Sequence, residues 1–284
     1  MPANPERLFQ DVKFLTSIFP FRNYKNEKSL NAAADYIAQT FTDLGLSFER
    51  QQWEVNQITY ENVIASYQPQ HQRRLIIGAH YDVYKDTYGA DDNASGVATV
   101  LELARLFKQS TPSMDYGIDF AAYSLEEPPF FRSNNMGSYQ HARSVFESGR
   151  EIIGMVALEM LGYYGEKKAN NFQKGPYRIH PKNFLIVAGI DKYAPFNQKI
   201  QQALSGDRWL IPMTKTFSAL DKNAGPSDHR NFWKFDYPAV MLIGSSGEKN
   251  PHYHKITDTI DTLDFSIMAR AVDACFRMLK GMDH

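Results

Sequence analysis

The sequence predicts an α/β fold in which a central mixed, mostly parallel sheet lies between layers of helices. Short apolar runs of strand length alternate along the chain with longer segments whose apolar residues recur at helical spacing. This alternation favours parallel strands, because each crossover helix packs on a face of the sheet. The chain has 284 residues, 43% of them hydrophobic, so we expect one domain with a large core over residues 1–284.

Individual segments show the two periodicities. In residues 29–44, Ala33, Ile37 and Phe41 recur about one helical turn apart, whereas residues 74–79 form a short apolar run typical of a strand buried on both faces. The expected strands are 48–55, 62–67, 74–79, 116–123, 152–161, 183–189 and 239–243. The expected helices are 8–19, 29–44, 97–107, 137–148, 195–205 and 265–280.

The charge balance gives no indication of a nucleic-acid or membrane-surface partner. Lysine and arginine number 31 and acidic residues 32, so the formal net charge is −1, whereas such partners favour a basic patch. The one cysteine, Cys275, cannot form an internal disulfide and is expected to be a small buried hydrophobe. The first residues do not resemble a signal peptide, and no apolar run approaches ~18 residues, so we expect a cytoplasmic protein.

Metal-binding residue types follow the expected strands at the points where those strands end. In an open α/β sheet, ligands gather beyond the carboxyl ends of the strands, so we expect these side chains to lie together. His80 and Asp82 are two residues apart on an extended segment and can therefore point to one side of the sheet. The candidates are His80, Asp82, the pair Asp91-Asp92, the pair Glu126-Glu127, Glu159 and His254.

These residue types indicate a two-metal hydrolytic site. The carboxylate of Asp92 has two oxygens and can bridge ions ~3.5–4 Å apart, the separation that two-metal hydrolases use. Glu126 and Glu127 are adjacent, so their side chains diverge, and one can bind metal while the other serves as a base toward water. Donors restricted to oxygen and imidazole nitrogen favour zinc, with cobalt or manganese as substitutes.

Five short motifs follow one another along the chain. They are Gly78-Ala-His-Tyr-Asp82, Gly89-Ala-Asp-Asp-Asn-Ala-Ser-Gly96, Glu126-Glu127, Ser227-Asp-His-Arg-Asn-Phe232, and Pro251-His-Tyr-His254 followed by Asp258-Thr-Ile-Asp-Thr-Leu263. Each motif alone is weak, but in this order they resemble the M28 family of zinc exopeptidases. The resemblance covers Leu75 to the C-terminus and implies a zinc exopeptidase-like fold and an aminopeptidase that acts on peptides with a free N-terminus.

The resemblance also implies a role for each matching residue. Asp92 resembles the bridging carboxylate, followed by a cis peptide, while Glu126 resembles the general base and Asp82 the outer partner of His80. The family usually has aspartate at the position of Glu159, and the longer side chain bears on the affinity or geometry of one metal. The implied ligands are His80, Asp92 and Glu159 for one zinc, and Asp92, Glu127 and His254 for the other.

Three other functions are alternatives to this interpretation. Glutaminyl cyclase-like acyltransferases resemble this fold and keep one zinc, on counterparts of Asp92, Glu127 and His254. The additional metal-competent pair, His80 and Glu159, favours the two-zinc peptidase. Hydrolysis of a non-peptide amide stays open, whereas the presence of every implied ligand argues against a non-catalytic binding domain.

The remaining histidines and acidic residues have structural interpretations. His252 and His229 compete with His254 as ligands, but position in the family motif favours His254. Asp228 and His229 are expected to shape the pocket or its surroundings, and Asp91 to support its turn. Surface positions are expected for His71, His141, His180 and the loop-like segment 163–181.

Overall fold

Eight strands form one mixed sheet in the computed structural model, which describes residues 1–165, 183–207, 210–221, 223–244 and 250–282. The strands lie in the order β1-β2-β4-β3-β5-β8-β6-β7. They are β1 (Ser47–Val55), β2 (Ile58–Tyr67), β3 (Arg73–His80), β4 (Gly117–Tyr123), β5 (Glu151–Glu159), β6 (Phe184–Ile190), β7 (Ile211–Phe217) and β8 (Ala239–Ile243).

The middle of the sheet is parallel. Strand β3 pairs in parallel with β4 and β5, and β5 pairs in parallel with β8. Strands β1 and β2 form an antiparallel hairpin beside β4, and β6 runs antiparallel to β8. The four parallel strands therefore end at one edge of the sheet, where α/β proteins place their ligands.

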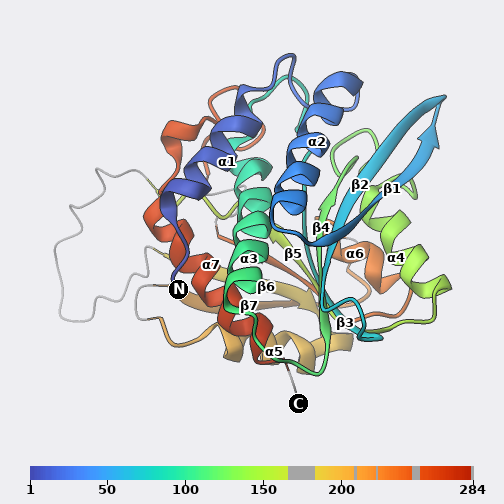
Figure 1. The fold of residues 1–284 in the computed structure, drawn as a ribbon, viewed down its shortest axis with the longest axis vertical. Coiled ribbons are helices and arrows are strands. Elements are labelled where there is room, and N and C mark those ends of the chain that lie inside the picture. Colours follow the sequence, from blue (N-terminus) through green and yellow to red (C-terminus); the bar gives the residue numbers. More distant parts are fainter. Residues whose placement is uncertain (166–182, 208–209, 222, 245–249, 283–284) are drawn as a thin grey trace.

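Helices cover both faces of the sheet, as Figure 1 shows. Helix α3 is almost entirely buried because it packs between the sheet and the helices α1, α2 and α7. Helices α4 and α6 contact each other on the opposite face. The helices are α1 (Pro5–Ser17), α2 (Glu27–Asp43), α3 (Gly96–Ser110), α4 (Gly137–Glu147), α5 (Ala194–Leu204), α6 (His229–Trp233) and α7 (Phe265–Lys280).

The predicted fold class is confirmed, and each predicted strand and helix is present with small shifts at its ends. Two elements were missed. Strand β7 lies at the sheet edge, has no buried residue and contains Pro212, and polar residues interrupt its apolar ones, so it lacks the apolar run of a central strand. Helix α6 has five residues, too few to show a helical period. Most of the loop predicted over residues 163–181 lies outside the described residues.

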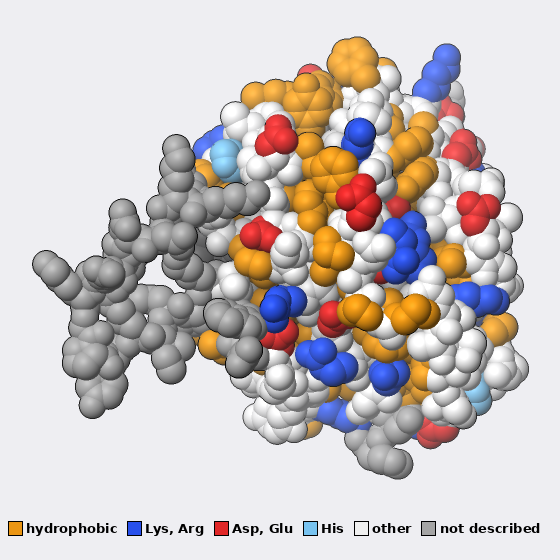
Figure 2. All heavy atoms as spheres, turned by 60° about the vertical axis from the view of Figure 1, so that its left-hand side comes forward, with side chains coloured by type: hydrophobic (Ala, Val, Ile, Leu, Met, Phe, Trp, Pro, Cys, Tyr) orange, Lys and Arg blue, Asp and Glu red, His pale blue; other side chains and the backbone are white. Residues whose placement is uncertain are grey.

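The surface agrees with the near-neutral charge balance. Figure 2 shows acidic and basic side chains interspersed over one face of the molecule. Within the described residues, no helix combines the length and apolar character needed to cross a bilayer. Cys275 is buried in α7, as predicted.

The surface position predicted for His141 is wrong. This side chain is buried in α4, its Nδ1 lies 3.0 Å from the hydroxyl of Tyr123, and burial lowers its pKa to about 4. His71 is half-buried, and His180 lies outside the described residues. A lone histidine in a helical pattern gives no sign of which face it occupies.

A buried arginine ties the N-terminal segment to the loop that follows β3. The guanidinium of Arg22 donates to the carbonyls of Leu15 and Tyr81, at 2.9 and 2.8 Å. It also donates to the carbonyls of Tyr88 and Gly89, at 2.7 and 2.6 Å. Burial lowers the pKa of Arg22 to about 10, so the group stays charged at neutral pH. The guanidinium of Arg22 thus holds the loop between His80 and the turn before α3 in place.

Replacing Arg22 with methionine is expected to destabilise the protein by about 3–5 kcal/mol, because buried carbonyls lose their donor and buried carboxylates lose a nearby positive charge. Urea unfolding measures the change. The matched control is Arg143→Met, since Arg143 forms an exposed pair with Glu147 at 3.7 Å and such pairs contribute up to about 1 kcal/mol. Equal losses in the two variants would contradict the anchoring role of Arg22.

Candidate metal centre

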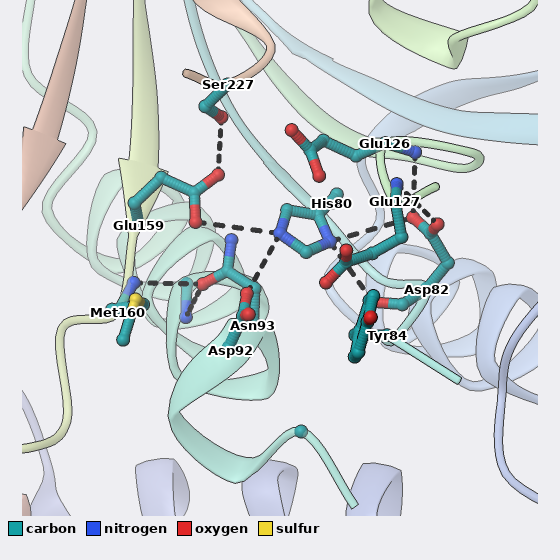
Figure 3. A network of polar contacts seen from close by, with 12 residues as sticks. His80, Asp82, Tyr84, Asp92, Asn93, Glu126, Glu127, Glu159, Met160 and Ser227 are labelled. Carbon is teal, nitrogen blue, oxygen red and sulfur yellow. Dashed lines mark hydrogen bonds and ion pairs between the residues drawn. The ribbon is translucent and has the colours of Figure 1, made fainter. Parts of the chain in front are cut away.

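The structure brings the predicted site residues together at the carboxyl edge of the parallel strands. His80 and Glu159 are the last residues of β3 and β5, so their positions are set by the central sheet. Glu126 and Glu127 follow β4, Asp92 lies in the turn before α3, and His254 lies in the loop after β8. Figure 3 shows the carboxylates of Asp92, Glu126, Glu127 and Glu159 arranged around the imidazole of His80.

The carboxylate of Asp92 is shared between two imidazoles. His80 Nε2 lies 3.3 Å from Asp92 Oδ1 and 3.5 Å from Glu159 Oε2. On the other side, His254 Nε2 lies 3.2 Å from Asp92 Oδ2 and 3.3 Å from Glu127 Oε1. The five residues thus form two sets of three donors, and Asp92 belongs to both.

These separations fit tetrahedral metal ions. Donors about 2.0–2.1 Å from a tetrahedral zinc lie roughly 3.3–3.4 Å from one another, which matches the 3.2–3.5 Å measured here. In addition, the buried Oε1 of Glu127 has no close hydrogen-bond donor among the described residues besides His254 Nε2, at 3.3 Å. A buried carboxylate oxygen with so few donors is stabilised by a nearby cation. The residues therefore fit one metal ion in each set.

A third grouping places donor atoms of His80, Glu126 and Glu127 within 4.8 Å of one another. It takes His80 from one set and Glu127 from the other, so Glu126 lies beside both sets. The side chain of Glu126 is buried, and burial raises its pKa well above the usual range. This carboxyl group is therefore able to hold a proton at the centre of the site.

The electrostatics of the site also favour cations. Burial alone would raise the pKa of Asp92, but hydrogen bonds from His254 and His80 outweigh it and hold that pKa below its usual range. Burial would lower the pKa of His254, but Asp92 and Glu127 raise it to about 10. The pKa of His80 is likewise raised, against burial, chiefly by Glu159. Each imidazole thus holds a proton where a metal cation would bind, so metal binding releases protons.

The pKa of Glu127 shows that the negative charge of the carboxylates at the site is not fully balanced. Burial and the neighbouring Asp92 raise its pKa to about 7, although the hydrogen bond with His254 acts in the other direction. Two carboxylates that share a small buried volume cannot both stay ionised without nearby positive charge. A metal ion between them would supply that charge.

The carboxylate of Asp82 supports two of these residues through their backbone. It accepts hydrogen bonds from the amides of Glu126 and Glu127, at 3.1 and 3.0 Å. Its Oδ1 also lies 3.6 Å from His80 Nδ1, while its own carbonyl oxygen lies closer to that nitrogen, at 3.1 Å. Asp82 therefore orients both His80 and the glutamate pair, and its carbonyl as well as its carboxylate contacts the imidazole.

A second aspartate supports the turn that carries Asp92. The carboxylate of Asp258 accepts from the amides of Asp91 and Asp92, at 2.9 and 3.1 Å. Asp91 points away from the donor sets, and its carboxylate accepts from the amide of Gly162 at 2.8 Å and from the side chain of Asn250 at 2.7 Å. The prediction that Asp91 supports its turn is confirmed, and Asp91 also ties that turn to two other loops.

The longer ligand Glu159 has its own support. The hydroxyl of Ser227 donates to Glu159 Oε1 at 2.5 Å, which leaves Oε2 facing His80. Asp228 and His229, which follow Ser227, are fully buried beneath the site. The Asp92–Asn93 peptide is cis, in agreement with the family resemblance, and the Asn93 side chain accepts from the amide of Met160 at 3.2 Å.

A cavity of about 580 Å³ opens beside the donor sets. Its floor is one face of β6 and β8, on the side of the sheet opposite α5, where Met241 and Ile243 form a small apolar cluster with Met160 and Ala188. Other lining residues include Ile186, Lys215, Phe217, Pro226 and Tyr253. The cavity therefore joins a charged end at the donors to an apolar floor.

Three supporting residues were missed at the sequence level. Arg22 and Asn250 carry no local signal, because their partners lie far away in the chain. Asp258 does have a local signal, because it is the first residue of the Asp258–Leu263 part of the last motif. Its role, however, depends on an amide group 166 residues earlier in the chain. Only tertiary structure shows these pairings.

A sequence model of peptidase family M28 matches residues 62–279 of this chain. The Escherichia coli (strain K12) protein YfbL, itself described as uncharacterised, is 36% identical over an alignment of 291 positions that covers 98% of this chain and 88% of YfbL. The chain belongs to peptidase family M28. Leucine aminopeptidase 1 of Ajellomyces dermatitidis is 26% identical over 279 residues, covering 93% of this chain and 67% of that protein.

Solved structures share the fold. The leucine aminopeptidase precursor of Bacteroides thetaiotaomicron matches 99% of this chain and 98% of its own, with a TM-score of 0.77 and 20% identity. The glutaminyl cyclase of the same organism covers 99% of both chains, with a TM-score of 0.78 and 20% identity. The M28 fold thus carries at least two chemistries, and the residues at the site must distinguish them.

Replacing Asp258 with asparagine is expected to destabilise the metal-free protein by about 1–3 kcal/mol, because an amide nitrogen replaces one of two acceptors for backbone N–H groups. Thermal unfolding in the presence of a chelator measures this change. Asp261→Asn is the control, since Asp261 is exposed in the same segment. If the two variants unfold alike, Asp258 does not hold the turn.

Proposed function

We propose that this M28 chain is a zinc-dependent aminopeptidase that removes N-terminal residues from peptides. The observation that carries the proposal is the carboxylate of Asp92, whose two oxygens each face an imidazole and a further carboxylate. This arrangement suits two ions held by one bridging ligand, as in two-metal hydrolases.

One zinc ion would be held by His80, Asp92 and Glu159, and the other by Asp92, Glu127 and His254. When bound, such ions polarise a substrate carbonyl and lower the pKa of water. The imidazole and carboxylate donors are those zinc prefers in catalytic sites. Asp82 orients His80, and Ser227 orients Glu159, so two of the three ligands of the first ion are held by neighbouring groups.

Glu126 is the proposed general base. It lies beside both donor sets, and its raised pKa suits a group that takes a proton from water and returns it to the leaving amine. Its backbone amide is held by Asp82, which fixes where the side chain begins. Glu127 belongs to the donor set of Asp92 and His254 whereas Glu126 belongs to neither set, and this difference supports separate roles for the two residues.

The cavity supports a preference for apolar N-terminal side chains. Its floor is made by Met160, Met241 and Ile243, and it lies next to the donors that face the scissile bond. Lys215 brings a positive charge to the lining and therefore disfavours lysine or arginine at the N-terminus of the substrate. The carboxylates of the site would attract the free α-amino group, which accounts for exopeptidase action.

A glutaminyl cyclase-like acyltransferase is the second candidate, because a cyclase shares the fold over 99% of both chains. The pair His80 and Glu159 favours the peptidase. These residues form a complete second donor set with Asp92, which a one-zinc enzyme does not need.

The activity is tested on a panel of aminoacyl-coumarins with and without a chelator. Leucyl and methionyl substrates are expected to be cleaved at least tenfold faster than lysyl or arginyl ones, because the cavity floor is apolar. Chelation should abolish cleavage, and added zinc should restore it. A panel that stays uncut while zinc is bound would instead favour the cyclase, which an N-terminal glutaminyl peptide detects, or another amide substrate.

Replacing Glu126 with glutamine is expected to lower kcat by about 10²–10⁴-fold, because the proton acceptor is lost while the size of the side chain is kept. Metal content should stay at the wild-type value, as measured by atomic emission. Glu147→Gln, at an exposed position of α4, is the control for general effects. Near-wild-type turnover in Glu126→Gln would remove this residue from the base role.

A further inference from the structure

The imidazole of His254 lies between two tyrosine rings. The Tyr84 ring is stacked on it with centroids 4.0 Å apart and an interplanar angle of 7°. The Tyr253 ring is stacked at 3.8 Å and 21°. One face of an imidazole has room for one parallel ring at such a distance, so the two tyrosines cover opposite faces of His254.

His254 differs from the other four proposed ligands in how it is held. Its side chain is 26% exposed, whereas those of His80, Asp92, Glu127 and Glu159 are 2–8% exposed. It lies in a loop rather than at the end of a strand, and its backbone has a positive φ of 57°. Regular secondary structure therefore does not fix this imidazole, and side-chain packing must do so.

The two rings are not equivalent supports. Tyr253 is the neighbour of His254 in the chain and moves with the same loop. Tyr84 lies in the segment that follows β3, the strand that ends with His80. In Figure 3 it lies beside Asp82, on the side of the site with Glu127. Tyr84 thus connects the imidazole of His254 to the segment that follows β3.

The segment around Tyr84 is itself held in place. The hydroxyl of Thr87 donates to the Tyr84 carbonyl at 2.7 Å, and Asn23 donates to the Lys85 carbonyl at 2.6 Å. The ammonium of Lys85 lies over the Tyr84 ring, 4.7 Å from its centroid. The backbone hydrogen bonds and the ammonium beside the ring therefore hold the Tyr84 side chain in place against His254.

The stack also favours an electron-poor imidazole. Aromatic rings carry negative charge density on their faces, and a metal ion draws electron density from the imidazole it binds. Two ring faces therefore stabilise an imidazole that carries positive charge, whether from a proton or from a bound metal ion. They also hold Nε2 toward Asp92 and Glu127, so less side-chain entropy is lost on binding.

From these contacts we propose that Tyr84 is a positioning residue that sets the metal affinity of the donor set formed by Asp92, Glu127 and His254. The proposal rests on the metal centre proposed above. Tyr84 itself does not belong to either donor set. It nevertheless controls whether the ion of the set Asp92, Glu127 and His254 is held. The donor set of His80 and Glu159 does not depend on it.

The test is a metal titration of the chelator-treated protein, in which zinc competes with a chromophoric chelator and cobalt binding is followed by visible absorption. In Tyr84→Leu, one of the two binding steps is expected to weaken about tenfold while the other stays within twofold. Tyr84→Phe keeps the ring and is the matched control, expected to bind both ions like the wild type. Neither readout depends on turnover.

A double-mutant cycle assigns the weakened step. In a His254→Ala background, adding Tyr84→Leu should change the affinity of the remaining ion less than twofold, because the residue through which Tyr84 acts is gone. The proposal is overturned if Tyr84→Leu binds both ions normally, if both steps weaken equally, or if Tyr84→Phe is as weak as Tyr84→Leu. A wild-type chain that binds neither ion would instead refute the proposed metal centre.

Discussion

Buried negative charge at one edge of the sheet is the constraint on which the rest of the structure depends. Eight carboxylates of the described residues are buried around this edge, and such groups are costly without positive partners. They are Asp82, Asp91, Asp92, Glu126, Glu127, Glu159, Asp228 and Asp258. A fold that only had to be stable would not gather them, so the arrangement itself indicates a site for cations.

The protein balances this charge in three distinct ways. Two carboxylates, those of Asp82 and Asp258, each accept from a pair of successive backbone amides. The guanidinium of Arg22 lies below the same loops and bonds only to carbonyls, so its charge stays available to the carboxylates nearby. The carboxylates of Asp92, Glu127 and Glu159 face His80 and His254, and their negative charge is the part that metal ions would balance.

The sequence was sufficient for the parts of the molecule in which local pattern and chemistry coincide. The apolar runs predicted the central strands, and the acidic and histidine residues at their ends predicted which side chains would meet, because parallel strands bring their carboxyl ends together. Glu159 is an example: its place at the end of β5 could be read from the run before it. Strand β7 was missed since an edge strand needs no apolar run, and α6 since it is too short to repeat.

The supporting residues could not be predicted for a different reason. A ligand is recognised by its own chemistry, whereas a support is defined by a partner elsewhere in the chain. Tyr84 illustrates this: phenol rings are usually packing residues, and the role of this one exists only because the loop with His254 folds back against it. A few ligand residues therefore determine the chemistry of such a site. Its geometry depends on residues in several loops, such as Arg22, Tyr84 and Asn250, and the local sequences of these loops do not indicate that role.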